Sequence, residues 1–243
     1  MRVHASIEPL HWESDFFQLD SAKLHLDSSV APVAEADLDA YTLVQAKIPA
    51  QQLALADGLA GLGFRLVEGE VDLVLALEDG RADEPGDGVE TSRLATEADI
   101  PALRAAAAQA FTVSRFRAPW YQPDDSGRFY ALWIEKAVLG TFDHLCLLAL
   151  DEQGQPEGFV SLRNIGGQDM RIGLLAAFPG ASGRGIGTRL MVAAIAESRR
   201  QGMQRLRVAT QISNIAALRL YQRQGAVIES TAYWLYRGKH DSI

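Results

Sequence analysis

Three closely spaced glycines in the stretch "SGRGIGTRLM", residues 182–191, could bind a phosphate group. Gly183, Gly185 and Gly187 follow the strand-like segment "RIGLLAAF" and precede a helical pattern. A glycine-rich turn at such a junction gathers backbone N–H groups at the positive end of a helix dipole. Because glycine has no Cβ atom, a diphosphate can approach the main chain closely. Glycines also mark plain turns, so an ordinary tight connection stays open as the alternative.

A second set of chemical groups lies on the helix predicted to begin near Asn214. Asn214 and Tyr221 fall within roughly 20° of each other on a helix, with Leu218 on the same face. An amide and a phenol on one stripe could hold a ligand and donate a proton to it. The structural alternative is that Asn214 caps the helix while Tyr221 is a core residue with a paired hydroxyl.

The elements that position these groups form a regular order from residue 85 to residue 243. The patterns predict a strand, two helices, three strands, a helix, a strand, a helix and two closing strands. Asp99 and Pro101 mark the entry of the first helix. Turn residues between "HLCLLALD", "EGFVSLRNI" and "MRIGLLAAF" predict antiparallel hairpins. The closing strands are "AVIES" and "YWLYR".

An acidic, glycine-containing stretch at residues 76–90 has the composition of a linker. It predicts a small α/β domain at residues 1–84 and a second domain at residues 85–243. Strand patterns in "AYTLVQAKI", "FRLVEG" and "VDLVLAL", with a helical pattern in "AQQLALADGLAGLG", support the smaller domain. Trp12, Phe16 and Phe17 in "HWESDFF" predict a local hydrophobic plug rather than a ligand contact.

The element order, with "LLAAFPGASGRGIGTRLM" and "NIAALRLYQRQGA", resembles the GCN5-related N-acetyltransferase superfamily. The family's hallmark, Arg/Gln-x-x-Gly-x-Gly/Ala, reads Ser182-Gly183-Arg184-Gly185-Ile186-Gly187, with Ser182 at the position of the usual Arg or Gln. The resemblance implies an α/β (α+β) fold whose mixed central sheet is splayed. It also implies acetyl-CoA as the co-substrate. No metal is expected, because the histidines show no ligand spacing.

The resemblance assigns roles to individual residues. Backbone amides hold the diphosphate of acetyl-CoA in the loop that comprises Ser182, Gly183, Arg184, Gly185, Ile186, Gly187 and Thr188. The strand segment Leu175, Ala176 and Ala177 pairs with the pantetheine arm, which requires a bulge or divergence near Leu175 to Phe178. Asn214 and Leu218 belong to the coenzyme site, and Tyr221 lies beside the thioester sulfur.

These roles would support acetyl transfer from a thioester to an amine. A backbone N–H near Leu175 to Ala177 would polarise the carbonyl oxygen. Tyr221, whose ordinary pKa is about 10, would protonate the departing thiolate as a general acid. No side chain is evident as the base, and a water relay is as good an expectation as any carboxylate.

Over its whole length, including "WESDFF", the chain resembles family members that acetylate the 4-amino group of dTDP-4-amino-4,6-dideoxygalactose for enterobacterial common antigen biosynthesis. Those members imply a homodimer. A sugar-nucleotide acceptor needs cations and aromatic faces, and "SRFRAPWY" offers Arg115, Arg117, Trp120 and Tyr121. A solvated basic loop is the alternative. A different amine acceptor, or an acyl-CoA-binding regulator without activity, also remains open.

Composition disfavours several other classes of protein, among them nucleic-acid binders, membrane proteins and secreted proteins. A net charge of −8 disfavours sequence-indifferent nucleic-acid binding. No stretch has the length and apolarity of a membrane span or a secretory signal, so we expect a cytoplasmic protein. The one cysteine, Cys146, lies in an apolar run and is interpreted as a buried structural thiol. The five histidines have no metal-ligand spacing.

Overall fold

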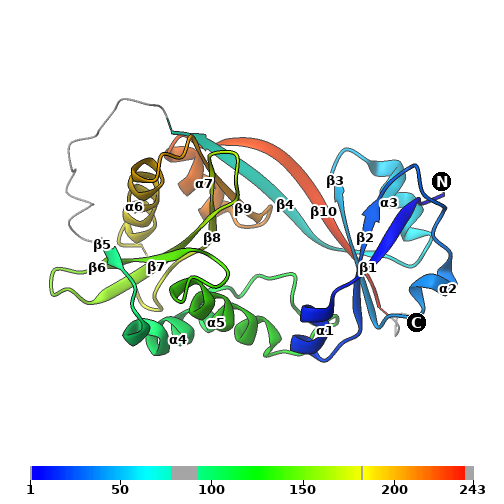
Figure 1. Cartoon of the computed structure of the whole chain (residues 1–243), viewed down its shortest axis with the longest axis horizontal. Coiled ribbons are helices and arrows are strands. Elements are labelled where there is room, and N and C mark those ends of the chain that lie inside the picture. Colours follow the sequence, from blue (N-terminus) through cyan, green and yellow to red (C-terminus); the bar gives the residue numbers. More distant parts are fainter. Residues whose placement is uncertain (1, 78–91, 182, 239–243) are drawn as a thin grey trace.

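A computed structural model describes residues 2–77, 92–181 and 183–238 (Figure 1). The strands are β1 (Ala5–Pro9), β2 (Ser21–Leu26), β3 (Leu43–Pro49), β4 (Arg65–Ala76), β5 (Ser92–Leu94), β6 (Leu145–Leu150), β7 (Pro156–Asn164), β8 (Asp169–Ala177), β9 (Arg205–Gln211) and β10 (Val227–Gly238). The helices are α1 (His11–Phe17), α2 (Glu35–Leu38), α3 (Leu53–Ala60), α4 (Ile100–Ala110), α5 (Asp125–Val138), α6 (Ile186–Arg200) and α7 (Ile215–Arg223), with a 3₁₀ turn at Glu97–Asp99 before α4. The expected mixed sheet with helices is confirmed.

The described strands form one ten-stranded sheet in the order β1-β2-β3-β10-β4-β9-β8-β7-β6-β5. The pairs β2/β3 and β8/β9 are parallel, and the other neighbouring pairs are antiparallel. The hairpins expected between β6, β7 and β8 are confirmed.

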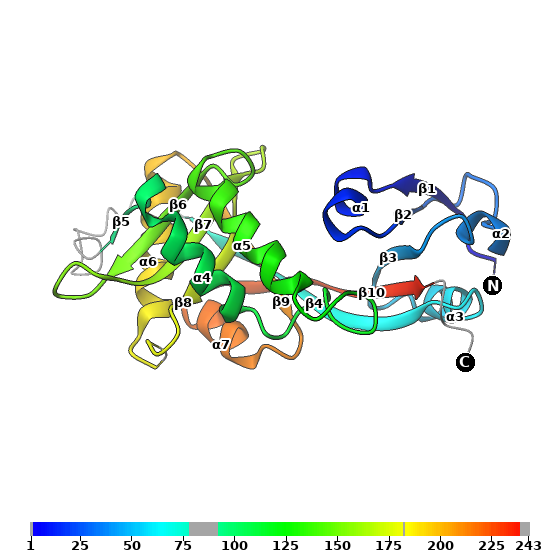
Figure 2. The same ribbon diagram turned by 90° about the horizontal axis from the view of Figure 1, so that it is seen from below.

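Helices cover both faces of the sheet where β6, β7 and β8 lie side by side. Side chains of α6 and α7 form one core with β4, β7, β8 and β9. Residues of α4 and α5 form a second core on β6, β7 and β8. In Figure 1 the two helix layers lie above and below the strands, and Figure 2 shows α4 and α5 from the side that they cover. The sheet is therefore the middle layer that carries the site.

Two pairs of predicted strands are single long strands. The segments "FRLVEG" and "VDLVLAL" form β4, and "AVIES" and "YWLYR" form β10, so both predictions of a break are wrong. Register shifts at Ile228/Ser230 and Trp234/Leu235 let β10 bend while it stays paired with β4. Both strands run from the part around α6 to the part around α3 (Figure 1).

The predicted boundary between residues 84 and 85 lies outside the described residues. β4, assigned to the smaller unit from sequence, pairs with β9 and β10 in the middle of the sheet. Separate cores nevertheless exist, because β2, β3 and α3 enclose a cluster around Leu38, Ile48 and Leu59. The two-unit division stays a prediction.

The aromatic residues of α1 pack where the N-terminal strands approach α5. Phe17 is buried against Phe116 and Tyr121, and Phe16 contacts Phe129. These contacts agree with the expected hydrophobic plug. Trp12 stacks on Phe16 but remains 46% exposed.

The remaining expectations from composition concern burial and membrane spans. Cys146 is buried on β6, and burial raises the pKa of its thiol, which suits a structural residue. No helix in the described ranges is long and apolar enough to cross a membrane.

Candidate active site

A cavity of 790 Å³ lies between β8, β9, α7, α5 and the connection after α4. The sheet opens at this point. β8 pairs with β9 only from Asp169 to Ile172, whereas it pairs with β7 up to Ala177. The strands expected to diverge near Leu175 to Phe178 therefore separate earlier, from Gly173 onward.

The open edge of β8 lines this cavity. Leu175, Ala176 and Ala177 all contribute to its wall. One extra residue on β8 opposite β7, between Ile172 and Leu175, produces a bulge at the start of the open segment. Beyond Ile172, none of the described strands pairs with the edge of β8 that faces β9, so an extended ligand could add there as a strand.

The bulge is fixed by a buried polar network. The Asp143 carboxylate is fully buried, and its Oδ2 accepts hydrogen bonds from Trp133 Nε1 at 2.8 Å and from Ser161 Oγ at 2.5 Å. Ser161 Oγ in turn accepts the backbone N–H of Leu174 at 2.9 Å. The missing side chain of Gly173 makes room for this carboxylate. The network thus ties the backbone of β8 to the side chains beneath it.

The glycine loop leads into α6 as predicted. Gly183 and Gly185 have φ of +83° and +75°, a conformation that favours glycine, and Gly185 is the N-cap. No acceptor in the described part of the chain pairs with the backbone N–H groups of Arg184, Gly185 and Ile186. A loop of available amides at a helix N-terminus fits a diphosphate.

Side chains around this loop serve its structure. Arg184 and Arg189 both pair with the buried carboxylate of Glu157, Arg184 at 2.5 Å. Arg184 is therefore held by a carboxylate. Thr188 donates its backbone N–H to Gly185 O, which closes the first turn of α6. Ser182 lies outside the described residues.

The α7 helix presents Tyr221 to the cavity. Tyr221 is 5% exposed and lines the wall, and burial raises the pKa of its phenol, so the hydroxyl stays protonated at neutral pH. Asn214 lines the cavity too, and its side chain caps α7 by accepting the N–H of Ala217 at 3.1 Å. Leu218 and Leu220 both pack against the core beneath α7, but of the two only Leu220 lines the cavity.

The connection "SRFRAPWY" contains four residues predicted to contact the acceptor, and one of the four lines the cavity. Arg115 lines the wall, stacked on Phe116 and on Trp234 with its guanidinium carbon about 4 Å from each ring centre (4.2 and 4.1 Å). Burial works to lower the pKa of Arg115, but its neighbours Tyr236 and Tyr121 raise it, so the charge is kept.

The other three predicted acceptor residues lie away from the cavity wall. Tyr121 is buried in the aromatic cluster and accepts a hydrogen bond from Gln45. Trp120 packs edge-on against Tyr236. Arg117 is exposed and donates to the carbonyl oxygens of Ala118 and Val67. The sequence pattern predicted that all four residues contact the acceptor. Three of them instead make contacts that hold the connection in place.

Charged residues that sequence reasoning missed also face the cavity. Glu68 and Glu70 come from β4, and Arg163 and Arg171 from β7 and β8. Burial raises the pKa of Glu68. Burial would also raise the pKa of Glu70, but hydrogen bonds from Lys47 and Trp234 lower it.

The sequence contained a pattern that could have predicted that the acidic residues of β4 lie together. Glu68, Glu70 and Asp72 alternate with buried residues along β4 and so share one face of the strand. The arginines had no such signal, because only the register of β7 and β8 places Arg163 opposite Arg171.

A splayed strand edge and a buried tyrosine line one cavity, and the start of α6 reaches it at Gly187. Comparison with known proteins identifies the family. The model of the "Acetyltransferase (GNAT) family" matches residues 106–226. The dTDP-fucosamine acetyltransferase of Escherichia coli O6:H1 is 51% identical over 237 residues, which cover 98% of this chain and 100% of that protein. This chain belongs to the acetyltransferase (GNAT) family.

Solved GNAT structures support the fold. A GCN5-related N-acetyltransferase from Kribbella flavida matches with a TM-score of 0.60 at 18% identity, over 97% of this chain and 89% of that one. One from Sphaerobacter thermophilus matches with a TM-score of 0.57 at 18% identity, over 83% of this chain. The match spans 61% of the Sphaerobacter protein, which is less than two thirds of its length.

As a GNAT enzyme, the chain is an acetyltransferase, and acetyl-CoA is the acetyl donor of the family. The residues fit this donor, because the open β8 edge can pair with an extended arm and the amides at the start of α6 can hold a diphosphate. Among the described residues, no group of three or more His, Cys, Asp or Glu side chains is arranged to hold a metal ion.

Proposed function

We propose that this GNAT enzyme transfers the acetyl group of acetyl-CoA to the 4-amino group of dTDP-4-amino-4,6-dideoxygalactose, dTDP-fucosamine. The observation that carries the proposal is the 51% identity to the E. coli acetyltransferase of that name, which extends over that protein's full length. The match includes the N-terminal strands and α1, which lie outside the family segment 106–226. The match also includes β4, whose Glu68 and Glu70 line the cavity and lie outside the family segment.

Acidic and basic side chains both line the cavity, which supports an acceptor that carries a positive and a negative group. Carboxylates of Glu68 and Glu70 suit an amino group, and the guanidinium groups of Arg163 and Arg171 suit phosphate oxygens. A purely cationic acceptor such as a polyamine would have to approach these arginines. A sugar nucleotide with one amino group and one diphosphate matches both sets.

The chemistry follows from the residues around the open edge of β8. Bound acetyl-CoA supplies the thioester. A backbone N–H of the segment Leu175–Ala177 would polarise the thioester carbonyl oxygen. The Tyr221 phenol, kept protonated by burial, would give its proton to the leaving thiolate. Glu68 lies on the same wall with a raised pKa and could accept the proton of the amine through water.

Purified protein incubated with acetyl-CoA and dTDP-fucosamine tests this function. We expect release of the CoA thiol together with a sugar nucleotide heavier by one acetyl group. Amino-sugar nucleotides with the amine at another carbon, a polyamine and an aminoglycoside serve as comparison acceptors. Faster turnover of any of these than of dTDP-fucosamine would contradict the proposal.

We further propose that the enzyme works as a cytoplasmic homodimer that supplies the N-acetylated sugar for enterobacterial common antigen. The whole-chain resemblance supports this context. Light scattering coupled to size exclusion gives the mass in solution, and a monomer at micromolar concentration would contradict the dimer.

A further inference from the structure

Two arginines face each other across neighbouring strands of the cavity wall. Arg163 on β7 and Arg171 on β8 are direct partners in the antiparallel register, and both line the cavity. Like charges in directly opposite positions destabilise a sheet. Such a pair is expected to persist where an anion lies between the two guanidinium groups.

The carboxylates nearest to these arginines hold them weakly. Arg163 Nε lies 3.9 Å from Asp143 Oδ1, beyond hydrogen-bond range, and Arg171 Nη2 lies 3.4 Å from Asp72 Oδ1. In the same sheet, the guanidinium of Arg205 pairs with Asp169 at 2.5 Å. Arg163 and Arg171 therefore keep N–H donors for a further partner. Their side chains are 32% and 31% exposed, so a ligand in the cavity can reach them.

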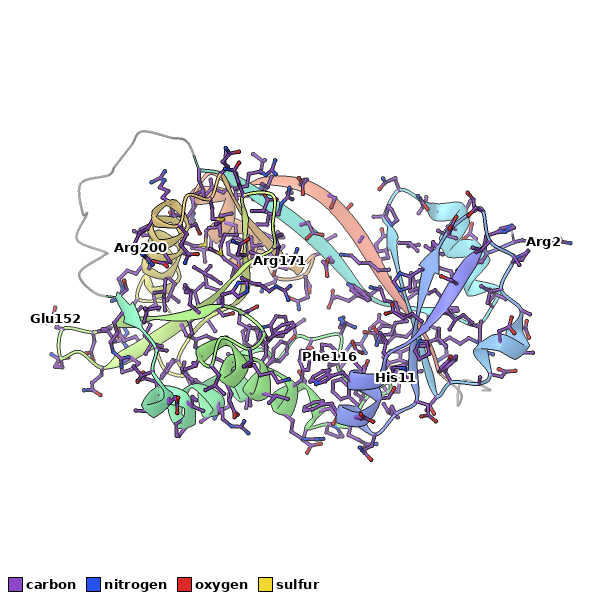
Figure 3. The ribbon with its side chains drawn as sticks, in the orientation of Figure 1. Arg2, His11, Phe116, Glu152, Arg171 and Arg200 are labelled. Atoms are coloured by element: carbon purple, nitrogen blue, oxygen red, sulfur yellow. The ribbon has the colours of Figure 1, made fainter. Side chains whose placement is uncertain are left out.

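Arg115, a further arginine on the cavity wall, has more partners than Arg163, whose guanidinium lies 4.7 Å from the centre of the Phe142 ring. It donates to Gln45 Oε1 at 3.0 Å and to the hydroxyl of Tyr236, and it stacks on Phe116 and Trp234. These contacts make it part of the wall. In Figure 3, Arg171 is labelled near β8, and Phe116, the residue that follows Arg115 in the chain, is labelled nearer to α1.

The position of the arginine pair suits a sugar nucleotide whose amine reacts at the bulge. Arg171 precedes Gly173 by two residues, so both lie on one face of β8, about 6.6 Å apart along the strand. At Gly173 this face is filled by the Asp143 carboxylate, so a ligand held by Arg171 meets this part of β8 at its open edge. Ala209, on the neighbouring strand β9, has a short side chain at the cavity wall and leaves space there for a sugar ring.

We propose that Arg163 and Arg171 bind the diphosphate of the acceptor while its amino group lies at the open edge of β8 beside the bulge. This inference rests on the proposed function and assigns the acceptor's anion to a site separate from the loop that begins α6. Glu68 and Glu70 disfavour a phosphate on their side of the cavity. The diphosphate is therefore directed to the Arg163 side of Arg171, away from β4.

Isothermal titration of dTDP tests the site directly. The enzyme is first saturated with CoA, so that the loop at the start of α6 is filled and dTDP can occupy only a second site. We expect Arg163→Gln and Arg171→Gln each to weaken dTDP binding about tenfold or more, since each removes charge-assisted hydrogen bonds. Arg171→Lys, which keeps the charge, should recover part of the affinity. Higher salt should weaken dTDP binding to the wild type more than to the double variant.

The matched control is Arg104→Gln, which removes an exposed arginine paired with Glu135 on the outer surface of α4 and α5. It should leave dTDP binding unchanged, and CoA binding should be unchanged in every variant. Arg163→Gln and Arg171→Gln should melt no lower than the wild type, because each removes one of two like charges in directly opposite positions. Equal dTDP affinity in wild type and double variant, or no dTDP binding to the wild type, would overturn the site. If dTDP binds through the arginines but dTDP-fucosamine is not acetylated, the proposed function fails and the anion site stands.

Discussion

A Cβ atom on Gly173 would lie 2.1 Å from Oδ2 of Asp143, so the carboxylate occupies the space that any other residue would need. The same Cβ atom would be 2.8 Å from Ser161 Oγ. Asp143 and Ser161 are the residues that hold the backbone of Leu174. The geometry of β8 at its open edge is therefore set by a buried acid behind it.

Gly173→Ala should damage both stability and turnover. The carboxylate or β8 must move, and overpacking of this kind costs about 1–3 kcal/mol. Thermal unfolding and CoA thiol release measure the two effects. Gly61→Ala is the matched control, because its new Cβ atom would meet only Gly58 O and Asp57 O at ordinary distances of 3.4 and 3.6 Å. Wild-type turnover in Gly173→Ala would show that the bulge geometry does not matter.

Tyr221→Phe should keep the fold and acetyl-CoA binding but lower kcat by about 10²-fold or more, the usual worth of a general acid. The direction of the pKa shift also predicts how kcat depends on pH. Because burial raises the pKa of Tyr221, its phenol stays protonated above the ordinary value of about 10, so kcat should not fall between pH 8 and 10 through loss of this donor. Tyr233→Phe, which alters a tyrosine packed in the N-terminal cluster, is the control. Near-wild-type kcat in Tyr221→Phe would refute the assignment.

Gly185→Ala should raise the KM for acetyl-CoA. Its φ of +75° costs a side chain about 1–2 kcal/mol, and the new Cβ atom would stand in the loop proposed to hold the diphosphate. Gly154→Ala provides a control with the same strain, since Gly154 has a φ of +77° in the turn between β6 and β7. Both variants should melt at similarly lowered temperatures. An equal KM in the two would remove the loop from the coenzyme site.

Asp99→Asn should lower stability in a pH-dependent manner, by about 1 kcal/mol at neutral pH for the lost helix-start contacts. Hydrogen bonds from Arg93 hold the pKa of Asp99 well below its ordinary value, and those from Thr96 add to this against the effect of burial. A lowered pKa in the folded state stabilises the protein above pH 4, and this contribution is lost as the pH falls toward the folded-state pKa. The difference in unfolding free energy between wild type and variant should therefore shrink below pH 4. A constant difference would contradict this reading of Asp99.

Local patterns in the sequence determined the parts of the site that depend on neighbours along the chain. The glycines at 183, 185 and 187 predicted a turn into α6, and the spacing of Asn214 and Tyr221 predicted one face of α7. Helix phase and turn geometry act over a few residues, so these features could be predicted without knowing the fold. Leu218 and Tyr221 belong to the same core cluster, but of the two only Tyr221 lines the cavity, which helix phase alone does not decide.

Tertiary structure alone decided which distant residues share the cavity. The pairing of β7 with β8 sets Arg163 against Arg171, and the loop before β6 places Asp143 behind Gly173. β4 brings Glu68 to the same wall as Arg171, which is 103 residues later in the sequence. Strand register and the burial of a carboxylate depend on long-range packing, and no local periodicity records them.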